Sequence, residues 1–99
     1  MIINKITENN SIILAVSGEL TAVTSEQLNI AIKAAIEETK CLMLDFKELE
    51  YVASAGLRVI LETKKSLDAK GGEFIIRNVC EAVMEVFEIT GFSDILRLE

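Results

Sequence analysis

A six-residue segment near the middle of the chain, residues 41–46 (CLMLDF), restricts the fold more than any other feature. Its apolar character is nearly continuous rather than alternating, and this pattern is typical of a strand buried on both faces, as in the centre of a parallel sheet. Patterns of helical period flank the segment at residues 25–38 and 55–69. Parallel strands need long crossover connections, which are usually helices. The segment therefore predicts an α/β fold with residues 41–46 as a central parallel strand.

The rest of the chain continues this alternation of strands and helices. The predicted strands cover residues 2–8, 11–17, 41–46, 73–77 and, unless the end of the chain is an apolar tail, 94–98. The predicted helices cover residues 25–38, 55–69 and 79–90. The first two strands form a hairpin, because only a turn at Asn9-Asn10 separates them. The order β-β-α-β-α-β-α-(β) predicts a single domain over residues 1–99, with a four- to five-stranded mixed sheet and helices mainly on one face.

Local signals indicate where the helices begin and end. Thr24 and Gln27 match a capping box, in which each side chain bonds the backbone N–H of the other residue. Gly71-Gly72 is expected to end the second helix and Gly91 the third, since glycine tolerates the left-handed backbone common at helix termini. Residues 47–53 are expected to form a loop. The second helix should bury one side, made of Leu57, Ile60, Leu61, Leu67 and the stem of Lys64.

Composition excludes several kinds of partner. The 99 residues carry a formal charge of −6, and Lys and Arg are scattered, so no basic patch can neutralise the phosphates of nucleic acid or an anionic membrane surface. The acidity favours a partner with a basic face. No apolar run approaches the roughly 20 residues that span a bilayer, and the first residues do not resemble a signal peptide. We therefore expect a cytoplasmic protein without membrane insertion.

Catalytic and metal-binding motifs are missing from the sequence. The chain has no histidine, so a Ser-His-Asp triad is impossible, and Ser54 lacks the Gly-x-Ser-x-Gly elbow of hydrolases. Cys41 and Cys80 are far apart in sequence and lie in apolar surroundings, which predicts buried free thiols rather than a disulfide or a metal site. We expect no catalytic residue, metal or cofactor, and therefore a binding protein rather than an enzyme.

Ser54 stands where the predicted loop gives way to an apolar helix pattern, in the segment YVASAGLRVIL. Serine is among the most favoured helix N-caps, because its hydroxyl accepts the free N–H groups of the first turn. The same place suits a phosphate, which would meet those N–H groups and the positive end of the helix dipole. The residues alone leave both interpretations, helix N-cap and modification site, equally open.

Three segments, taken together, resemble one known family. They are SGELTAVTSEQL near the first helix, LMLDFKELEYVASAGLRVIL around Ser54, and FIIRNVCEAVMEVFEITGFSDILRLE at the end of the chain. Their order and spacing are similar to the signature of STAS-domain proteins, in particular the bacterial anti-sigma factor antagonists. The resemblance covers essentially the whole chain and implies the STAS fold, whose element order agrees with the one predicted above.

The resemblance also implies a function. In that family, the serine that matches Ser54 is phosphorylated, with ATP, by a partner that is both a serine kinase and an anti-sigma factor. The unphosphorylated antagonist binds this partner and frees a sigma factor, and phosphorylation releases the antagonist. By the same resemblance, the partner-binding residues are Gly18, Glu19, Thr21, Ala53, Ser54, Ala55, Gly56 and Leu57. Asp45 matches a family aspartate that we expect to fix the following loop by hydrogen bonds.

Two positions depart from the family pattern. Thr21 and Ala53 stand where the family often has aspartate, and both changes remove negative charge from the expected contact surface. Two alternatives therefore stay open beside the phosphorylated antagonist. One is a STAS scaffold, or a subunit of a larger regulatory or transport assembly, with Ser54 only a helix N-cap. The other is a small enzyme or a lipid- or anion-binding domain. A homodimer is also left open by the sequence.

Overall fold

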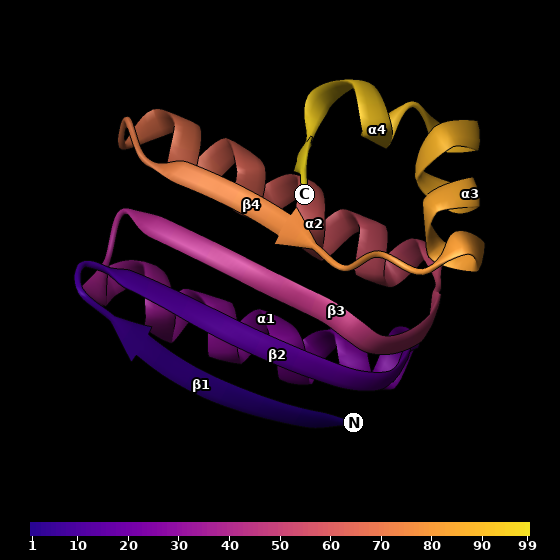
Figure 1. Ribbon diagram of the computed structural model, residues 1–99, viewed down its shortest axis with the longest axis horizontal. Coiled ribbons are helices and arrows are strands. Elements are labelled where there is room, and N and C mark those ends of the chain that lie inside the picture. Colours follow the sequence, from indigo (N-terminus) through magenta and orange to yellow (C-terminus); the bar gives the residue numbers. More distant parts are fainter.

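The computed structural model describes residues 1–99 and contains one five-stranded sheet with four helices (Figure 1). The strands are β1 (Ile2–Glu8), β2 (Ser11–Leu20), β3 (Cys41–Val52), β4 (Glu73–Arg77) and β5 (Arg97–Leu98). The helices are α1 (Ala22–Glu38), α2 (Ser54–Ala69), α3 (Glu81–Thr90) and α4 (Phe92–Ile95). The strands lie in the order β1-β2-β3-β4-β5, with β1 antiparallel to β2 and the other neighbours parallel. The predicted mixed α/β sheet, with β3 at its centre, is confirmed.

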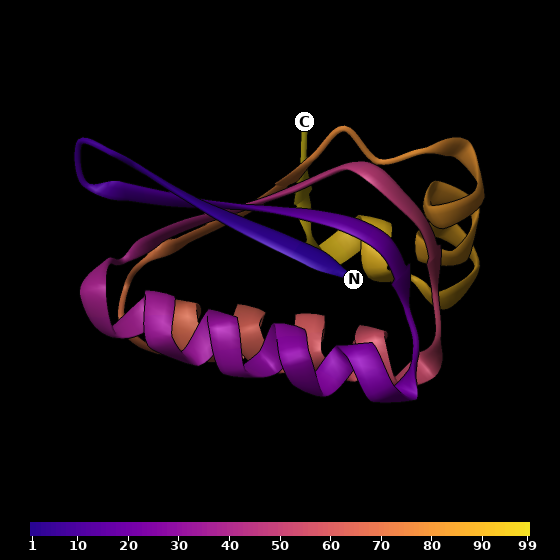
Figure 2. The ribbon, with the colours of Figure 1, turned by 90° about the horizontal axis from the view of Figure 1, so that it is seen from below.

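The helices cover only one face of this sheet. Helices α1 and α2 lie side by side beneath it, α3 and α4 pack at one end, and no helix crosses the opposite face (Figure 2). Along β3, Leu42, Leu44 and Phe46 are fully buried toward the helices, whereas Met43 and Asp45 point to the other face and are only half-buried. The predicted burial of this strand on both faces is therefore wrong, because one of the two faces has no covering layer.

Two strands run further than the sequence predicts. β2 continues through Gly18 to Leu20, and β3 continues through most of the predicted loop to Val52. The pairing of the two strands shifts register twice, between Ala15 and Ser17 and again after Gly18, where the backbone φ is +103°. Such bulges bend strands and interrupt the alternation of buried and exposed residues. Both strands consequently curve toward the helices at their carboxyl ends (Figure 2).

The core lies between the sheet and the helices, mainly α1 and α2, and α3 adds Val83 and Phe87 to it. Its largest fully buried side chains are Phe46, Phe87, Leu14, Leu20, Leu28, Ile32, Leu42, Leu44, Leu49, Ile60, Leu67 and Ile76. The buried residues of α2 are Gly56, Val59, Ile60, Thr63 and Leu67. Leu57 and Leu61, which the sequence placed on the buried side, are half-buried instead, and Lys64 is half-buried at the edge as predicted. Gly56 lets this side of α2 approach the end of β2 closely, because glycine has no side chain to hold the helix and the strand apart.

The last part of the chain is only partly as predicted. Gly71 (φ +69°) follows α2 and Gly91 (φ +82°) ends α3, which confirms both glycine stops. Asp94 lies in the short helix α4 and not in a strand. Only Arg97–Leu98 form β5, which pairs with β4 in parallel. The terminal strand is thus confirmed but is much shorter than residues 94–98.

Candidate functional site

Two segments that are distant in sequence meet at the carboxyl ends of β2 and β3. Glu19 pairs with Tyr51 and Leu20 with Val52, and the Ala53 N–H donates to the Leu20 carbonyl at 2.8 Å. Helix α1 begins directly after β2, and helix α2 directly after β3. The residues predicted to bind a partner, namely Gly18, Glu19, Thr21 and residues 53–57, are therefore brought together at one end of the sheet. This is the edge at which open α/β sheets commonly place their binding sites.

Helix α1 begins earlier than predicted, with Thr21 as its N-cap. Thr21 Oγ1 accepts from the Thr24 N–H at 3.2 Å, and Thr24 Oγ1 accepts from the Thr21 N–H at 2.7 Å. The capping box predicted from Thr24 to Gln27 is therefore wrong, since Thr24 is the reciprocal partner in a box that starts at Thr21. The Thr24 hydroxyl also donates to the Glu19 carbonyl at 2.7 Å. Thr21 thus holds the end of β2 and the start of α1 in one fixed geometry.

Ser54 is the first residue of α2 and not its N-cap. Ala53 occupies the cap position in an extended conformation, and its carbonyl accepts from the N–H groups of Gly56 (2.9 Å) and Leu57 (3.1 Å). No side chain caps this helix. The N-cap interpretation of Ser54 is therefore wrong, because the helix starts one residue after the position at which a side chain caps. The Ser54 side chain is exposed, and its hydroxyl makes no hydrogen bond to the rest of the chain.

The predicted partner-binding residues differ in what they offer to a partner. Glu19 and Ser54 are exposed, and Gly56 is buried. The half-buried members of the set are Gly18, Thr21, Ala53, Ala55 and Leu57. A Cβ built on Gly56 would lie 2.6 Å from Leu20 Cδ2, so Gly56 packs against the core and offers no surface. Sequence reasoning missed two exposed apolar residues on these segments, Val23 and Tyr51. Tyr51 was hidden within the predicted loop, and Val23 preceded the predicted start of the first helix.

Asp45 lies on the helix-free face of β3, before the bulge and away from Ser54. Its Oδ1 accepts from Asn78 Nδ2 at 2.9 Å and from the Lys47 N–H at 3.1 Å, and Arg77 Nε lies 3.7 Å from Oδ2. Burial raises the pKa of this carboxyl, but the two hydrogen bonds and the positive charges of Arg77 and Lys47 outweigh burial. The pKa of Asp45 is therefore lowered from its ordinary value of 3.8. The carboxylate ties the residues that follow it in β3 to the connection between β4 and α3.

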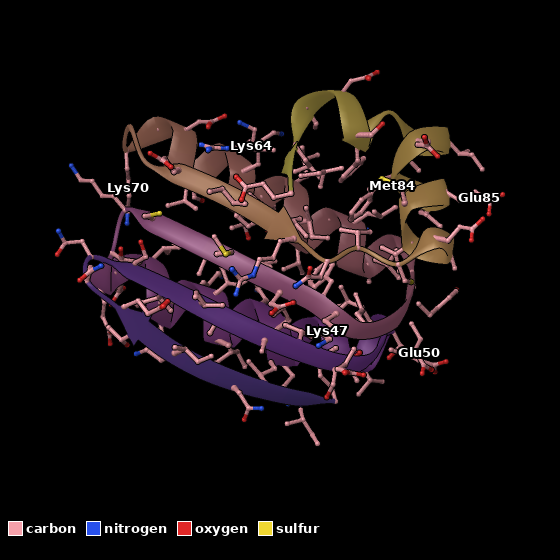
Figure 3. The ribbon with its side chains drawn as sticks, in the orientation of Figure 1. Lys47, Glu50, Lys64, Lys70, Met84 and Glu85 are labelled. Atoms are coloured by element: carbon pink, nitrogen blue, oxygen red, sulfur yellow. The ribbon has the colours of Figure 1, made fainter.

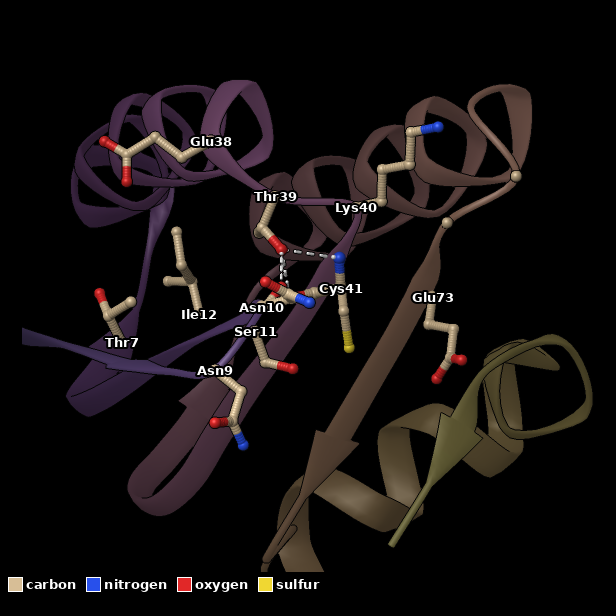
Figure 4. Close-up of a pocket in the computed structure, with 12 residues that line it drawn as sticks. Thr7, Asn9, Asn10, Ser11, Ile12, Glu38, Thr39, Lys40, Cys41 and Glu73 are labelled. Atoms are coloured by element: carbon tan, nitrogen blue, oxygen red, sulfur yellow. Dashed lines mark hydrogen bonds between the residues drawn. The ribbon is translucent and has the colours of Figure 1, made fainter.

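A polar cavity of about 520 Å³ lies at the opposite end of the parallel strands (Figure 4). Its walls come from the β1–β2 turn and from the connections that lead into β3 and β4. Thr39 occupies part of it, accepting from the Cys41 N–H at 3.0 Å and donating to the Asn10 carbonyl.

Cys41 and Cys80 are both free and half-buried, so the predicted free thiols are confirmed but their full burial is wrong. No group of three or more His, Cys, Asp or Glu residues could hold a metal ion.

Comparison with known proteins agrees with this architecture. Residues 2–99 match the STAS domain family. The chain is 35% identical to BtrV of Bordetella bronchiseptica over 85% of this chain and 73% of that protein. It is 30% identical to the anti-sigma-B factor antagonist of Listeria monocytogenes over 93% of this chain and 82% of that protein.

Solved structures share the fold at lower sequence identity. The anti-sigma factor antagonist SpoIIAA in its unphosphorylated form superposes with a TM-score of 0.85 at 22% identity, over 99% of this chain and 88% of that one. The phosphorylated form of the Bacillus protein SpoIIAA superposes with a TM-score of 0.78 at 21% identity, over 99% and 91% of the two chains. None of the helices of the present chain has the length and apolarity needed to cross a membrane. The chain belongs to the STAS-domain family, in the group that contains the anti-sigma factor antagonists.

Proposed function

We propose that this chain is an anti-sigma factor antagonist whose complex with its partner is ended by phosphorylation of Ser54. The partner is an anti-sigma factor that is also a serine kinase, and binding to the unmodified chain releases a sigma factor. The observation that carries the proposal is the free, exposed hydroxyl of Ser54 at the first position of α2. A serine used only to cap the helix would have its hydroxyl bonded to the backbone of the first turn.

The chemistry of the modification places the catalytic groups on the partner. Ser54 Oγ attacks the γ-phosphorus of ATP held by the kinase, the bond from that phosphorus to the β,γ-bridging oxygen breaks, and ADP leaves. The hydroxyl proton passes to a base of the kinase, because this chain has no histidine to take it. The proposed chain is therefore a substrate and binding protein and has no catalytic role.

The start of α2 suits a phosphate. The first N–H groups of a helix have no partner within the helix, and Ala53 has no polar side chain to cap them. A phosphate on Ser54 would meet these donors and the positive end of the helix dipole. Arg58, exposed one helical turn further on, lies on the same side of α2. The modified residue is thus accommodated locally, without a rearrangement of the fold.

Release follows from what the phosphate meets in the complex. After transfer, phosphoserine lies directly against the β-phosphate of ADP. The phosphoserine carries a charge of roughly −1.5 to −2, and the ADP phosphates are also negative, so the two groups repel each other in an interface that excludes water. The relatives named above support this assignment by their names, and SpoIIAA has been solved in both unphosphorylated and phosphorylated forms. The cytoplasmic location stays a prediction, and the homodimer stays one of the alternatives that the sequence left open.

The proposal is tested by phosphorylation in solution. The chain is incubated with ATP and a histidine-kinase-like ATPase from the same organism, chosen first from the products of neighbouring genes. Intact-mass spectrometry is expected to show a single added phosphate on the native chain and on Ser66→Ala, a matched serine exposed further along α2. Ser54→Ala is expected to take up none. A stable complex without phosphate transfer would instead support the STAS scaffold.

A further inference from the structure

Seven large apolar side chains are exposed, and two of them lie on the segments that build the Ser54 site. They are Ile2, Ile6, Val23, Ile30, Tyr51, Ile89 and Ile95. Tyr51 is 50% exposed at the end of β3, three residues before Ser54, and Val23 is 83% exposed in the first turn of α1. Single exposed apolar residues are common on protein surfaces, and these two differ from the other five in lying on the segments that build the Ser54 site.

Hydrogen bonds and strand pairing connect these two residues. Tyr51 pairs with Glu19, and the Glu19 carbonyl accepts from the hydroxyl of Thr24, the residue after Val23. Both side chains therefore stand on one rigid unit, which consists of the end of β2, the end of β3 and the first turn of α1. We call Val23 and Tyr51 together the apolar pair.

Two carboxylates that form no ion pair lie next to Tyr51. Glu19 and Glu50 are exposed next to Tyr51, and neither takes part in any of the ion pairs of the chain. Figure 3 shows Glu50 projecting outward from the bend of β3, with Glu85 of α3 at the same end of the molecule. An apolar centre with charged residues around it is the usual anatomy of a protein interface. The sign of the charge calls for basic side chains on the partner.

We infer that the apolar pair is the energetic centre of the anti-sigma factor interface, and that Glu19 and Glu50 orient a partner surface in which Lys or Arg side chains border an apolar pocket. This inference rests on the proposed function and extends it to Val23, Glu50 and Tyr51, which the sequence did not assign to the partner-binding surface. Tyrosine is enriched among the few interface residues that dominate binding, because it buries a large rigid ring at low entropic cost. The glutamates act mainly on the rate and orientation of association. The contacts of Val23, Tyr51, Glu19 and Glu50 with the partner then position Ser54 at the nucleotide.

The test measures the dissociation constant of the anti-sigma factor kinase for variants of the full chain by calorimetry. Tyr51→Ala is expected to weaken binding about tenfold or more, and Val23→Ala by a smaller factor. Tyr51→Phe keeps the ring and is expected to bind within about threefold of the native chain. The matched controls are Ile30→Ala and Ile89→Ala, which remove apolar side chains that are 63% and 79% exposed elsewhere. Both controls should bind as the native chain does.

Charge is tested separately from apolar contact. Glu19→Gln and Glu50→Gln are expected to slow association and to reduce its dependence on salt, whereas Glu37→Gln, exposed at the far end of α1, should do neither. If the native chain binds and Tyr51→Ala binds equally well, or if the control variants weaken binding as much, the inference is overturned while the proposed function stands. If the native chain itself does not bind the kinase, the proposed function fails and the inference fails with it.

Discussion

Gly56 and Leu20 are in direct contact: a Cβ at position 56 would lie 2.6 Å from Leu20 Cδ2 and 2.7 Å from its Cγ. Leu20 is the last residue of β2 and is fully buried, and Gly56 belongs to the first turn of α2. The close approach sets the height at which α2 begins beneath the sheet. It therefore also positions Ser54, which is two residues earlier in the same turn.

Gly56→Ala should destabilise the chain. Alanine is favoured over glycine within a helix by about 1 kcal/mol, but overpacking a dense core typically costs about 1–3 kcal/mol. The clash should win, because the added Cβ would also lie 3.0 Å from Val52 Cγ2, and Val52 is the strand partner of Leu20, so both neighbours would have to move. Urea unfolding should show a lower midpoint than for Ser66→Ala, an exposed control in the same helix. An unchanged or higher midpoint would show that Leu20 moves aside freely.

Thr21→Ala and Ser54→Ala should differ in their effect on stability. Thr21 caps α1 with a side-chain hydrogen bond, so its loss should lower the free energy of unfolding by about 0.5–2 kcal/mol. Ser54 makes no such bond, and its replacement should change the free energy of unfolding by less than about 0.5 kcal/mol. Both values follow from urea titrations monitored by circular dichroism. Equal losses for the two variants would restore the interpretation of Ser54 as a cap.

Asp45 should make stability depend on acidic pH. Its pKa in the folded chain lies below the ordinary value, so the carboxylate stabilises the fold above its unfolded-state pKa. That contribution is lost as pH falls through the lower, folded-state pKa. Asp45→Asn should therefore be less stable than the native chain at pH 7, with a difference that shrinks toward pH 3. The control is Asp94→Asn, whose carboxyl is exposed and accepts no hydrogen bond. A difference that stays constant with pH would refute a role of the charge.

Phosphorylation of Ser54 should stabilise the isolated chain. A negative group at the first turn of a helix contributes about 0.3–1 kcal/mol at low ionic strength, and Arg58 stands one turn away. Differential scanning calorimetry of the modified chain should give a Tm above that of the unmodified chain. The gain should shrink in Arg58→Ala and in high salt. A lower Tm on phosphorylation would mean that the phosphate strains the fold, which would point to release by local unfolding.

The sequence predicts the order of strands and helices because that order depends on local signals. These signals are the spacing of apolar residues along the chain and the glycines that end helices. The ends of β2 and β3 could not be predicted in this way. Their bulges interrupt the alternation of buried and exposed residues, so residues 47–53 read as a loop although most of them pair with β2. The one-sided burial of β3 was equally hidden, since Met43 is apolar whether or not a helix covers it.

The candidate site shows the same division. Ser54 could be found from its place before an apolar helix pattern, and the resemblance of the whole chain supplied a role for it. The hydrogen bonding of Ser54 could not be predicted, because a serine at the N-cap and a serine one position later look alike in sequence. Val23 and Tyr51 were missed because their exposure depends on the bend of the two strands and on the true start of α1 at Ala22.

The most direct test of the account is the affinity of the anti-sigma factor kinase for this chain before and after modification. The unmodified chain and the chain phosphorylated at Ser54 are titrated in parallel into the ADP-bound kinase. The account predicts a complex with the unmodified chain and a Kd at least about tenfold weaker for the phosphorylated one, which corresponds to about 1.4 kcal/mol. Equal Kd values for the two forms would contradict it.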